Sequence, residues 1–188
     1  MNAIAIRDES VFGMTLKATV IYDDFDFATR AAALLERVAA RTQEAIMWDV
    51  KPWRLDVLKQ PSLAEAAGAE AADADLLVFA LSRTQAPPPE LTSWLGQWEA
   101  HRQNQDAAVM VLTRSEHTAA TPLWHNLKEF AFGHGLAFLN SQDVRENGDS
   151  MQFVHQLWER KQPAAPALEL LADTPHLPRP PRHWGINE

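Results

Sequence analysis

Carboxylate and hydroxyl side chains stand at the ends of three strand-like stretches of this sequence. Asp23 and Asp24 follow residues 16–22, Ser82 follows residues 75–81, and Thr113 ends residues 107–113. If these stretches are parallel strands, their carboxyl ends meet at one edge of a sheet, where ligands of such folds collect. Oxygen atoms gathered there could hold a small polar ligand or a divalent metal. The candidate ligand-binding residues are Asp23, Asp24, Phe25, Ser82, Arg83, Thr84 and Thr113.

A structural role for the same residues is the alternative. Asp24 or Asp26 can cap the following helix by accepting hydrogen bonds from its free amide groups, and a negative charge suits the positive helix end. Arg83 or Arg114 would then neutralise Asp23. The spacing leaves both interpretations open.

Motifs for metal, nucleophilic or nucleotide chemistry are absent from the sequence. The chain has no cysteine, which excludes disulfides, thiolate metal sites and a cysteine nucleophile. His125 with Glu129, and His155 with Glu159, are spaced i,i+4, but neither pair forms a His-Glu-x-x-His zinc motif, so surface pairing or partial burial is expected. No nucleophile elbow, Walker loop or dinucleotide-binding glycine loop occurs. We therefore assign no catalytic residue, metal ligand or cofactor.

Two tryptophans could form an aromatic platform. Trp94 and Trp98 lie one helical turn apart, and with Leu91 and Leu95 they complete one apolar stripe. Such a stripe favours burial in the core or at a dimer interface over ligand binding.

Residues 53–56 (WRLD) follow the second predicted strand. They could form a recognition loop. Alternatively, Trp53 and Leu55 plug the base of that loop, while Arg54 and Asp56 pair with helix ends.

The elements that must position these residues alternate between strand and helix. Continuous apolar or β-branched runs predict strands, and apolar residues at helical spacing predict helices. Ser62 and Glu65 suggest a capping box, and Thr121 before Pro122 marks another helix start. Predicted strands cover residues 16–22, 44–50, 75–81, 107–113 and 136–139, and predicted helices begin near residues 24–26, 62, 89, 121 and 149–150.

This alternation predicts an α/β domain with a three-layer, doubly wound, five-stranded parallel sheet. We expect the strand order 2-1-3-4-5. Residues 1–15 would form an N-terminal arm, residues 16–161 the domain, and residues 162–188 a proline-rich tail. Trp184 and Ile186 favour docking of that tail onto the domain or a partner.

The sequence resembles the flavodoxin-like superfamily over roughly residues 16–160. Residues 74–81 (ADLLVFAL) and 88–95 (PPELTSWL) carry the resemblance. Flavodoxins and related quinone or FMN reductases have a similar segment, in which a strand ends in the flavin-facing loop and Pro-Pro-x-Leu opens the next helix. Residues 52–58 (PWRLDVL) are similar to a feature of uncharacterised bacterial proteins of this architecture. The resemblance implies a fold and no activity.

The loop after the first strand departs from the flavodoxin pattern. Flavodoxin-type loops are rich in Ser, Thr and Gly, because small residues let backbone amides close around the FMN phosphate. Residues 22–29 (YDDFDFAT) instead bring three carboxylates and two phenylalanines, which would repel a phosphate and obstruct its approach. We therefore expect a colourless protein that FMN does not stabilise.

The acidic pair also resembles the receiver domains of bacterial response regulators, which hold magnesium after the first strand. Asp23 and Asp24 match that pair, and Thr113 stands where receivers keep a hydroxyl. The phosphoacceptor aspartate is missing, because residues 80–82 read Ala-Leu-Ser, and residues 140–141 (Asn-Ser) replace the lysine of receivers. Without an acceptor, no phosphotransfer is expected.

Composition limits the partners. The net charge is −8 and no basic patch is visible, so we expect no nucleic-acid partner. The longest apolar run, residues 76–81, is far below the ~20 residues of a membrane span, and the first residues do not resemble an export signal. We expect a cytoplasmic bacterial protein without a membrane partner. Its seven tryptophans favour packing and a homodimer.

Three functions from different classes stay open at this point. The leading hypothesis is a non-catalytic domain that binds a small molecule or a protein partner at the carboxyl edge of the sheet. The second is an FMN- or NAD(P)H-dependent reductase with a divergent phosphate loop. The third is a degenerate receiver-like signalling module. Flavin colour would indicate the second function, and weak magnesium binding the third.

Overall fold

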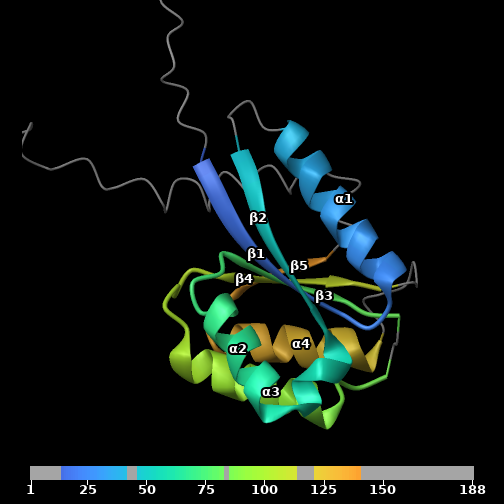
Figure 1. Ribbon diagram of the computed structural model, residues 1–188, viewed down its shortest axis with the longest axis vertical. Coiled ribbons are helices and arrows are strands. Elements are labelled where there is room, and N and C mark those ends of the chain that lie inside the picture. Colours follow the sequence, from blue (N-terminus) through green and yellow to red (C-terminus); the bar gives the residue numbers. More distant parts are fainter. Residues whose placement is uncertain (1–13, 42–45, 83–84, 114–120, 141–188) are drawn as a thin grey trace, which may run out of the picture.

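The structure is a computed structural model that describes residues 14–41, 46–82, 85–113 and 121–140 (Figure 1). The helix predicted near residue 150 and the tail with Trp184 and Ile186 lie outside the described residues. The strands are β1 (Met14–Tyr22), β2 (Ile46–Arg54), β3 (Leu76–Ala80), β4 (Ala108–Leu112) and β5 (Ala137–Asn140). The α-helices are α1 (Phe25–Arg41), α2 (Pro61–Ala71), α3 (Pro89–His101) and α4 (Pro122–Gly133), and a 3-10 helix, η1 (Leu55–Lys59), joins β2 to α2.

The five strands form one parallel sheet with the order β2-β1-β3-β4-β5. This confirms the predicted flavodoxin-like order. The last residues of β2, β1, β3 and β4 are neighbours across the sheet; these are Arg54, Tyr22, Ala80 and Leu112. The residues that follow them therefore emerge together, at what we call the carboxyl edge.

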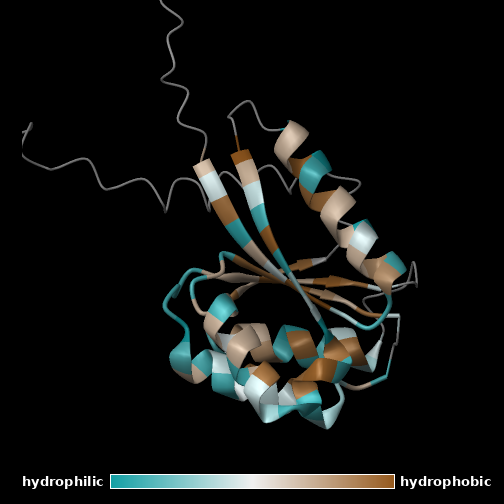
Figure 2. Cartoon of the chain, viewed as in Figure 1, coloured by the Kyte–Doolittle hydropathy of each residue, from teal (hydrophilic) through white to brown (hydrophobic). Residues whose placement is uncertain are grey.

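Helices cover the two faces of the sheet unequally in the described part of the chain. Figure 1 shows α1 on one face and α2, α3 and α4 on the other. The strands β3 and β4 are buried along their whole length, as their continuous apolar runs predict. In Figure 2 hydrophobic residues gather in these central strands and on the helix sides that face them. None of the described helices has the length and apolarity that a membrane span requires.

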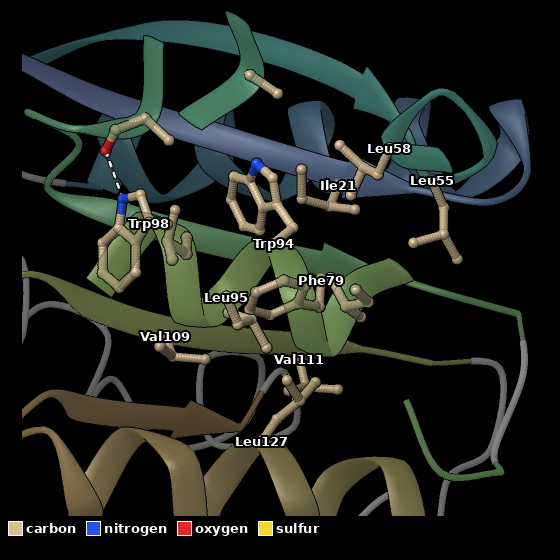
Figure 3. Close-up of a cluster of buried hydrophobic side chains, with 14 of the residues drawn as sticks. Ile21, Leu55, Leu58, Phe79, Trp94, Leu95, Trp98, Val109, Val111 and Leu127 are labelled. Atoms are coloured by element: carbon tan, nitrogen blue, oxygen red, sulfur yellow. Dashed lines mark hydrogen bonds between the residues drawn. The ribbon is translucent and has the colours of Figure 1, made fainter. Parts of the chain in front are cut away.

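The α2–α3 layer is held together by two indole groups. Trp94 and Trp98 are only 1% and 2% exposed, and Figure 3 shows them inside the core. The indole N–H of Trp94 donates to the carbonyl of Ala64 at 3.2 Å, and that of Trp98 donates to the carbonyl of Ala71 at 2.8 Å. The small side chains of α2 let both rings reach its backbone. The core interpretation of this stripe is confirmed.

The second strand is longer than predicted, and this changes the role of residues 53–56. Trp53 packs against the core and donates its indole N–H to Glu70 at 3.0 Å, while Leu55 is buried. Arg54 and Asp56 pair with each other at 2.6 Å, at the start of η1. The segment is therefore the end of a strand with a buried anchor rather than a recognition loop.

The capping-box prediction for α2 was wrong. The helix begins at Pro61, its N-cap is Gln60, and no side chain caps it. Proline is favoured at the first helical position, because its missing N–H would be unpaired there in any case. The prediction for α4 is confirmed: the Thr121 hydroxyl accepts from the amide of Trp124 at 3.3 Å.

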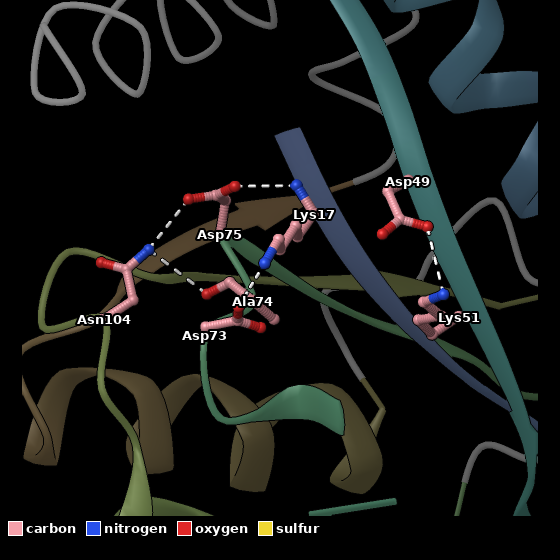
Figure 4. A network of polar contacts seen from close by, with 7 residues as sticks. All are labelled: Lys17, Asp49, Lys51, Asp73, Ala74, Asp75 and Asn104. Atoms are coloured by element: carbon pink, nitrogen blue, oxygen red, sulfur yellow. Dashed lines mark hydrogen bonds and ion pairs between the residues drawn. The ribbon is translucent and has the colours of Figure 1, made fainter. Parts of the chain in front are cut away.

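A buried carboxylate organises the opposite, amino edge of the sheet (Figure 4). Asp75 is 1% exposed; it accepts from the Lys17 amide at 2.7 Å and from the Asn104 side-chain amide at 2.9 Å. The Lys17 ammonium pairs with Asp73, and the hydrogen bond to that carboxylate raises the pKa of Lys17. This network ties β1 to β3 and to the loop before β4.

Candidate functional site

Asp23 and Ser82 join the ends of β1 and β3 at the carboxyl edge. One carboxylate oxygen of Asp23 accepts from the Ser82 amide at 2.8 Å, and the other accepts from the Ser82 hydroxyl at 2.9 Å. The two strands are neighbours although they are separated in sequence, and this is the point where the strand order reverses. Two predicted site residues therefore meet. Their contact engages both carboxylate oxygens of Asp23.

The next two residues begin α1. The Asp24 carboxylate accepts from the Asp26 amide at 3.0 Å, and the Asp24 carbonyl accepts from the amides of Phe27 and Ala28. Asp24 is thus the cap that the sequence predicts as one of two choices. Its carboxylate holds a free amide of the helix start, where a bound phosphate would otherwise be stabilised.

Phe25, the first residue of α1, is 75% exposed. It borders an apolar hollow of about 350 Å³ that lies between the first half of α1 and the carboxyl-terminal halves of β1 and β2. We call this space the α1 hollow. Its lining residues are Val20, Tyr22, Phe25, Ala28, Thr29, Ala32, Val50 and Pro52.

The α1 hollow exists because small side chains face the sheet on this side of the helix. Ala28 and Ala32 lie one turn apart and stand opposite Val50 and Pro52. The bulky residues of α1, such as Phe27 and Leu34, point into the core instead. The volume is within the range of small-molecule sites, although near its lower end.

The remaining predicted site residues are distributed as follows. Thr113 directly follows β4 and so lies at the same edge. Arg83, Thr84 and Arg114 lie outside the described residues, so the predicted neutralisation of Asp23 by an arginine stays a prediction.

The sequence interpretation missed most of the α1 hollow. Tyr22, Thr29, Val50 and Pro52 were not among the candidate residues. Alanines spaced i,i+4 on the predicted first helix were the available signal, but only the packing of α1 against β2 turns that spacing into a hollow.

Among the described residues, no cluster of three or more acidic or histidine side chains could hold a metal ion. His125 pairs with Glu129 at 3.1 Å, and both side chains are exposed, as expected of a surface pair.

A second hollow, of about 490 Å³, lies between α2 and α3. Ala64, Gly68 and Ala72 line one side of it, and Gln97 and His101 line the other. Because it belongs to the two-helix surface and not to the strand ends, we do not include it in the candidate site.

The fold and the site define a flavodoxin-like α/β domain with an acidic, capped first loop and an adjoining apolar hollow. No family model and no curated protein matches the chain. Two solved structures are similar in fold at low identity. An azoreductase from Bacillus anthracis str. Sterne has a TM-score of 0.42 and 8% identity over 77% of this chain and 96% of that one. Smu.1420 from Streptococcus mutans UA159 has a TM-score of 0.37 and 10% identity over 77% and 98%.

Proposed function

We propose that this protein is a non-catalytic binding domain that holds a small molecule in the α1 hollow at its carboxyl edge. The observation that carries the proposal is the position of the hollow. It is formed by Tyr22 and Phe25, which flank the Asp23–Asp24 turn, and thus adjoins the place where ligands of doubly wound sheets bind.

The polar groups at the carboxyl edge support a role in binding rather than in catalysis. Asp23 is committed to Ser82, and Asp24 to the start of α1. These contacts stabilise the loop that supports Tyr22 and Phe25. They leave an apolar wall with polar groups at its margin, which is the usual composition of a small-molecule site.

A flavin reductase with a divergent phosphate loop is the alternative that the first loop disfavours. A phosphate at the start of α1 would have to displace the Asp24 carboxylate from the Asp26 amide and would meet several negative charges. We therefore expect FMN to leave the melting temperature unchanged. A melting temperature that rises and saturates with FMN would instead favour the reductase.

The proposal is tested by filling the hollow. Ala32 lines it, whereas Ala33 is exposed on the same helix, so Ala32→Leu and Ala33→Leu add the same atoms on different sides of α1. Naphthalene-2-methanol serves as an uncharged aromatic probe in calorimetric titrations of the full chain.

We expect the probe to bind the unmodified protein and Ala33→Leu equally, and Ala32→Leu at least about tenfold more weakly, because the added atoms occupy the hollow and overpacking of this kind costs ~1–3 kcal/mol. Circular dichroism would verify that both variants are folded. Equal binding by both variants, or no binding by any form, would refute the α1 hollow as the site.

A further inference from the structure

We propose that the α1 hollow selects ligands that carry an organic ammonium group, with an apolar body in the hollow and the cation on its aromatic rim. This inference rests on the proposed function and names the class of ligand. It combines three observations: the aromatic rim, the sign of the charges beside it, and the uncharged lining.

The rim of the hollow presents two aromatic rings. Phe25 is largely exposed, and Tyr22, the only tyrosine of the chain, is partly exposed. Aromatic faces attract cations through their quadrupoles, and ammonium groups are recognised in this way.

The charges that flank Phe25 in sequence are negative. Asp24 and Asp26 immediately flank Phe25, and both are exposed. They lie within a Debye length of the mouth, since they adjoin a lining residue in sequence, and so they lower the energy of a cation there and raise that of an anion.

Two basic residues also adjoin lining residues in sequence, and both have other contacts. Arg30 follows Thr29, and its guanidinium lies 5.3 Å from the centre of the Phe27 ring. Lys51 lies between Val50 and Pro52 and pairs with Asp49 at 3.4 Å, and Arg54 pairs with Asp56. None of the lining residues of the α1 hollow carries a charge. A cation at the rim would therefore meet the carboxylates without a competing ammonium or guanidinium group from the lining.

The walls of the hollow suit the rest of such a ligand. Val20, Val50 and Pro52 present hydrocarbon from the strands, and Ala28 and Ala32 present it from the helix. The complementary molecule is a compact aryl or alkyl ammonium compound, and one that carries a phosphate is disfavoured.

Three probes that share one ring system but differ in charge isolate the effect of the ligand's charge on its affinity. They are (2-naphthylmethyl)trimethylammonium, naphthalene-2-methanol and 2-naphthylmethyl phosphate, each titrated calorimetrically into the full chain. We expect the ammonium compound to bind about three- to tenfold more tightly than the alcohol, and the phosphate to bind more weakly than the alcohol. Added salt should reduce the difference in affinity between the ammonium and the phosphate probes, because it screens their charges.

Two double variants separate local from overall charge. Asp24→Asn with Asp26→Asn removes two charges beside Phe25 and keeps a side-chain oxygen at the cap position, since asparagine caps as well as aspartate. Glu65→Gln with Glu129→Gln removes two charges from α2 and α4, on the other face of the sheet. In the first variant, the ratio of the affinity for the ammonium probe to that for the alcohol should fall to half or less. In the second variant, this ratio should stay unchanged.

The possible results discriminate between the inference and the proposed function. If all three probes bind equally, or if the phosphate binds best, the inference is wrong while the hollow remains a binding site. If the two double variants reduce the preference equally, the selectivity comes from net charge and the inference also fails. If no probe binds, both the inference and the proposed function are refuted.

Discussion

The carboxylate of Asp23 accepts hydrogen bonds from both the amide and the hydroxyl of Ser82, at 2.8 and 2.9 Å, and so links the ends of two neighbouring strands. The two residues are 59 positions apart in the sequence. This contact fixes the turn that leads into α1, and with it the placement of Tyr22 and Phe25 at the α1 hollow.

Removing this contact should destabilise the domain. Asp23→Ala leaves the amide and hydroxyl of Ser82 without their partner and should lower the free energy of unfolding by ~1–3 kcal/mol, whereas Ser82→Ala loses only the hydroxyl bond, keeps the amide bond and should cost less. Urea unfolding of both single variants and the double variant measures the coupling. Only the hydroxyl bond is lost in both single variants, because Ser82→Ala keeps its backbone amide, so the double variant should cost less than the sum. Strict additivity would show that the bond between the Ser82 hydroxyl and Asp23 contributes nothing.

The buried tryptophans predict a graded loss of stability. Trp98→Ala removes a side chain that is 2% exposed and should cost ~3–5 kcal/mol. Trp98→Phe keeps most of the ring but loses the bond to the Ala71 carbonyl, so its cost should be clearly smaller. Thermal and urea unfolding compare the two variants. Unchanged stability of Trp98→Ala would contradict the core assignment. The predicted homodimer stays a prediction, because both tryptophans of this stripe are buried within one chain.

Two glycines should respond oppositely to alanine. Gly135 ends the α4 turn with φ of +70°, a conformation that a Cβ disfavours, so Gly135→Ala should cost ~1 kcal/mol. Gly96 lies within α3, and a Cβ there would meet nothing within 4 Å, so Gly96→Ala should stabilise by ~0.5–1 kcal/mol. Differential scanning calorimetry of the two variants and the unmodified protein measures the direction of both shifts in melting temperature. Equal shifts in the same direction would contradict the backbone argument.

The Lys17–Asp73 pair predicts a pH effect at the alkaline end. Asp73 raises the pKa of Lys17 above 10.5 in the folded chain, so the pair stabilises the fold while the lysine is protonated. That stabilisation is fully present below pH 10.5 and is lost as the pH rises through the raised pKa. Lys17→Gln should therefore be slightly less stable than the unmodified protein at pH 8, and the difference should vanish in strong alkali. A difference that grows with pH would contradict the pairing.

The sequence was sufficient for the fold because the strong signals are local. Continuous apolar runs mark β3 and β4, and Thr121 with Pro122 marks the start of α4. The length of β2 was missed because Pro52 reads as a strand breaker. This strand is an edge of the sheet and pairs only with β1, and proline is tolerated at an edge.

The candidate site was only partly predictable from the sequence. The convergence of Asp23 and Ser82 follows from strand order alone, but their hydrogen bonds require the actual register of β1 and β3. The α1 hollow depends on which side of the helix faces β2, so Ala28 and Ala32 looked like ordinary helix residues.

The most direct test of the central claim, that the α1 hollow binds small molecules, is amide chemical-shift mapping of the full chain with naphthalene-2-methanol. We predict saturable shifts concentrated at Tyr22, Phe25, Thr29 and Val50, with the amides of α4 unmoved. Shifts concentrated in the α2–α3 surface, or none at a saturating probe concentration, would contradict the account.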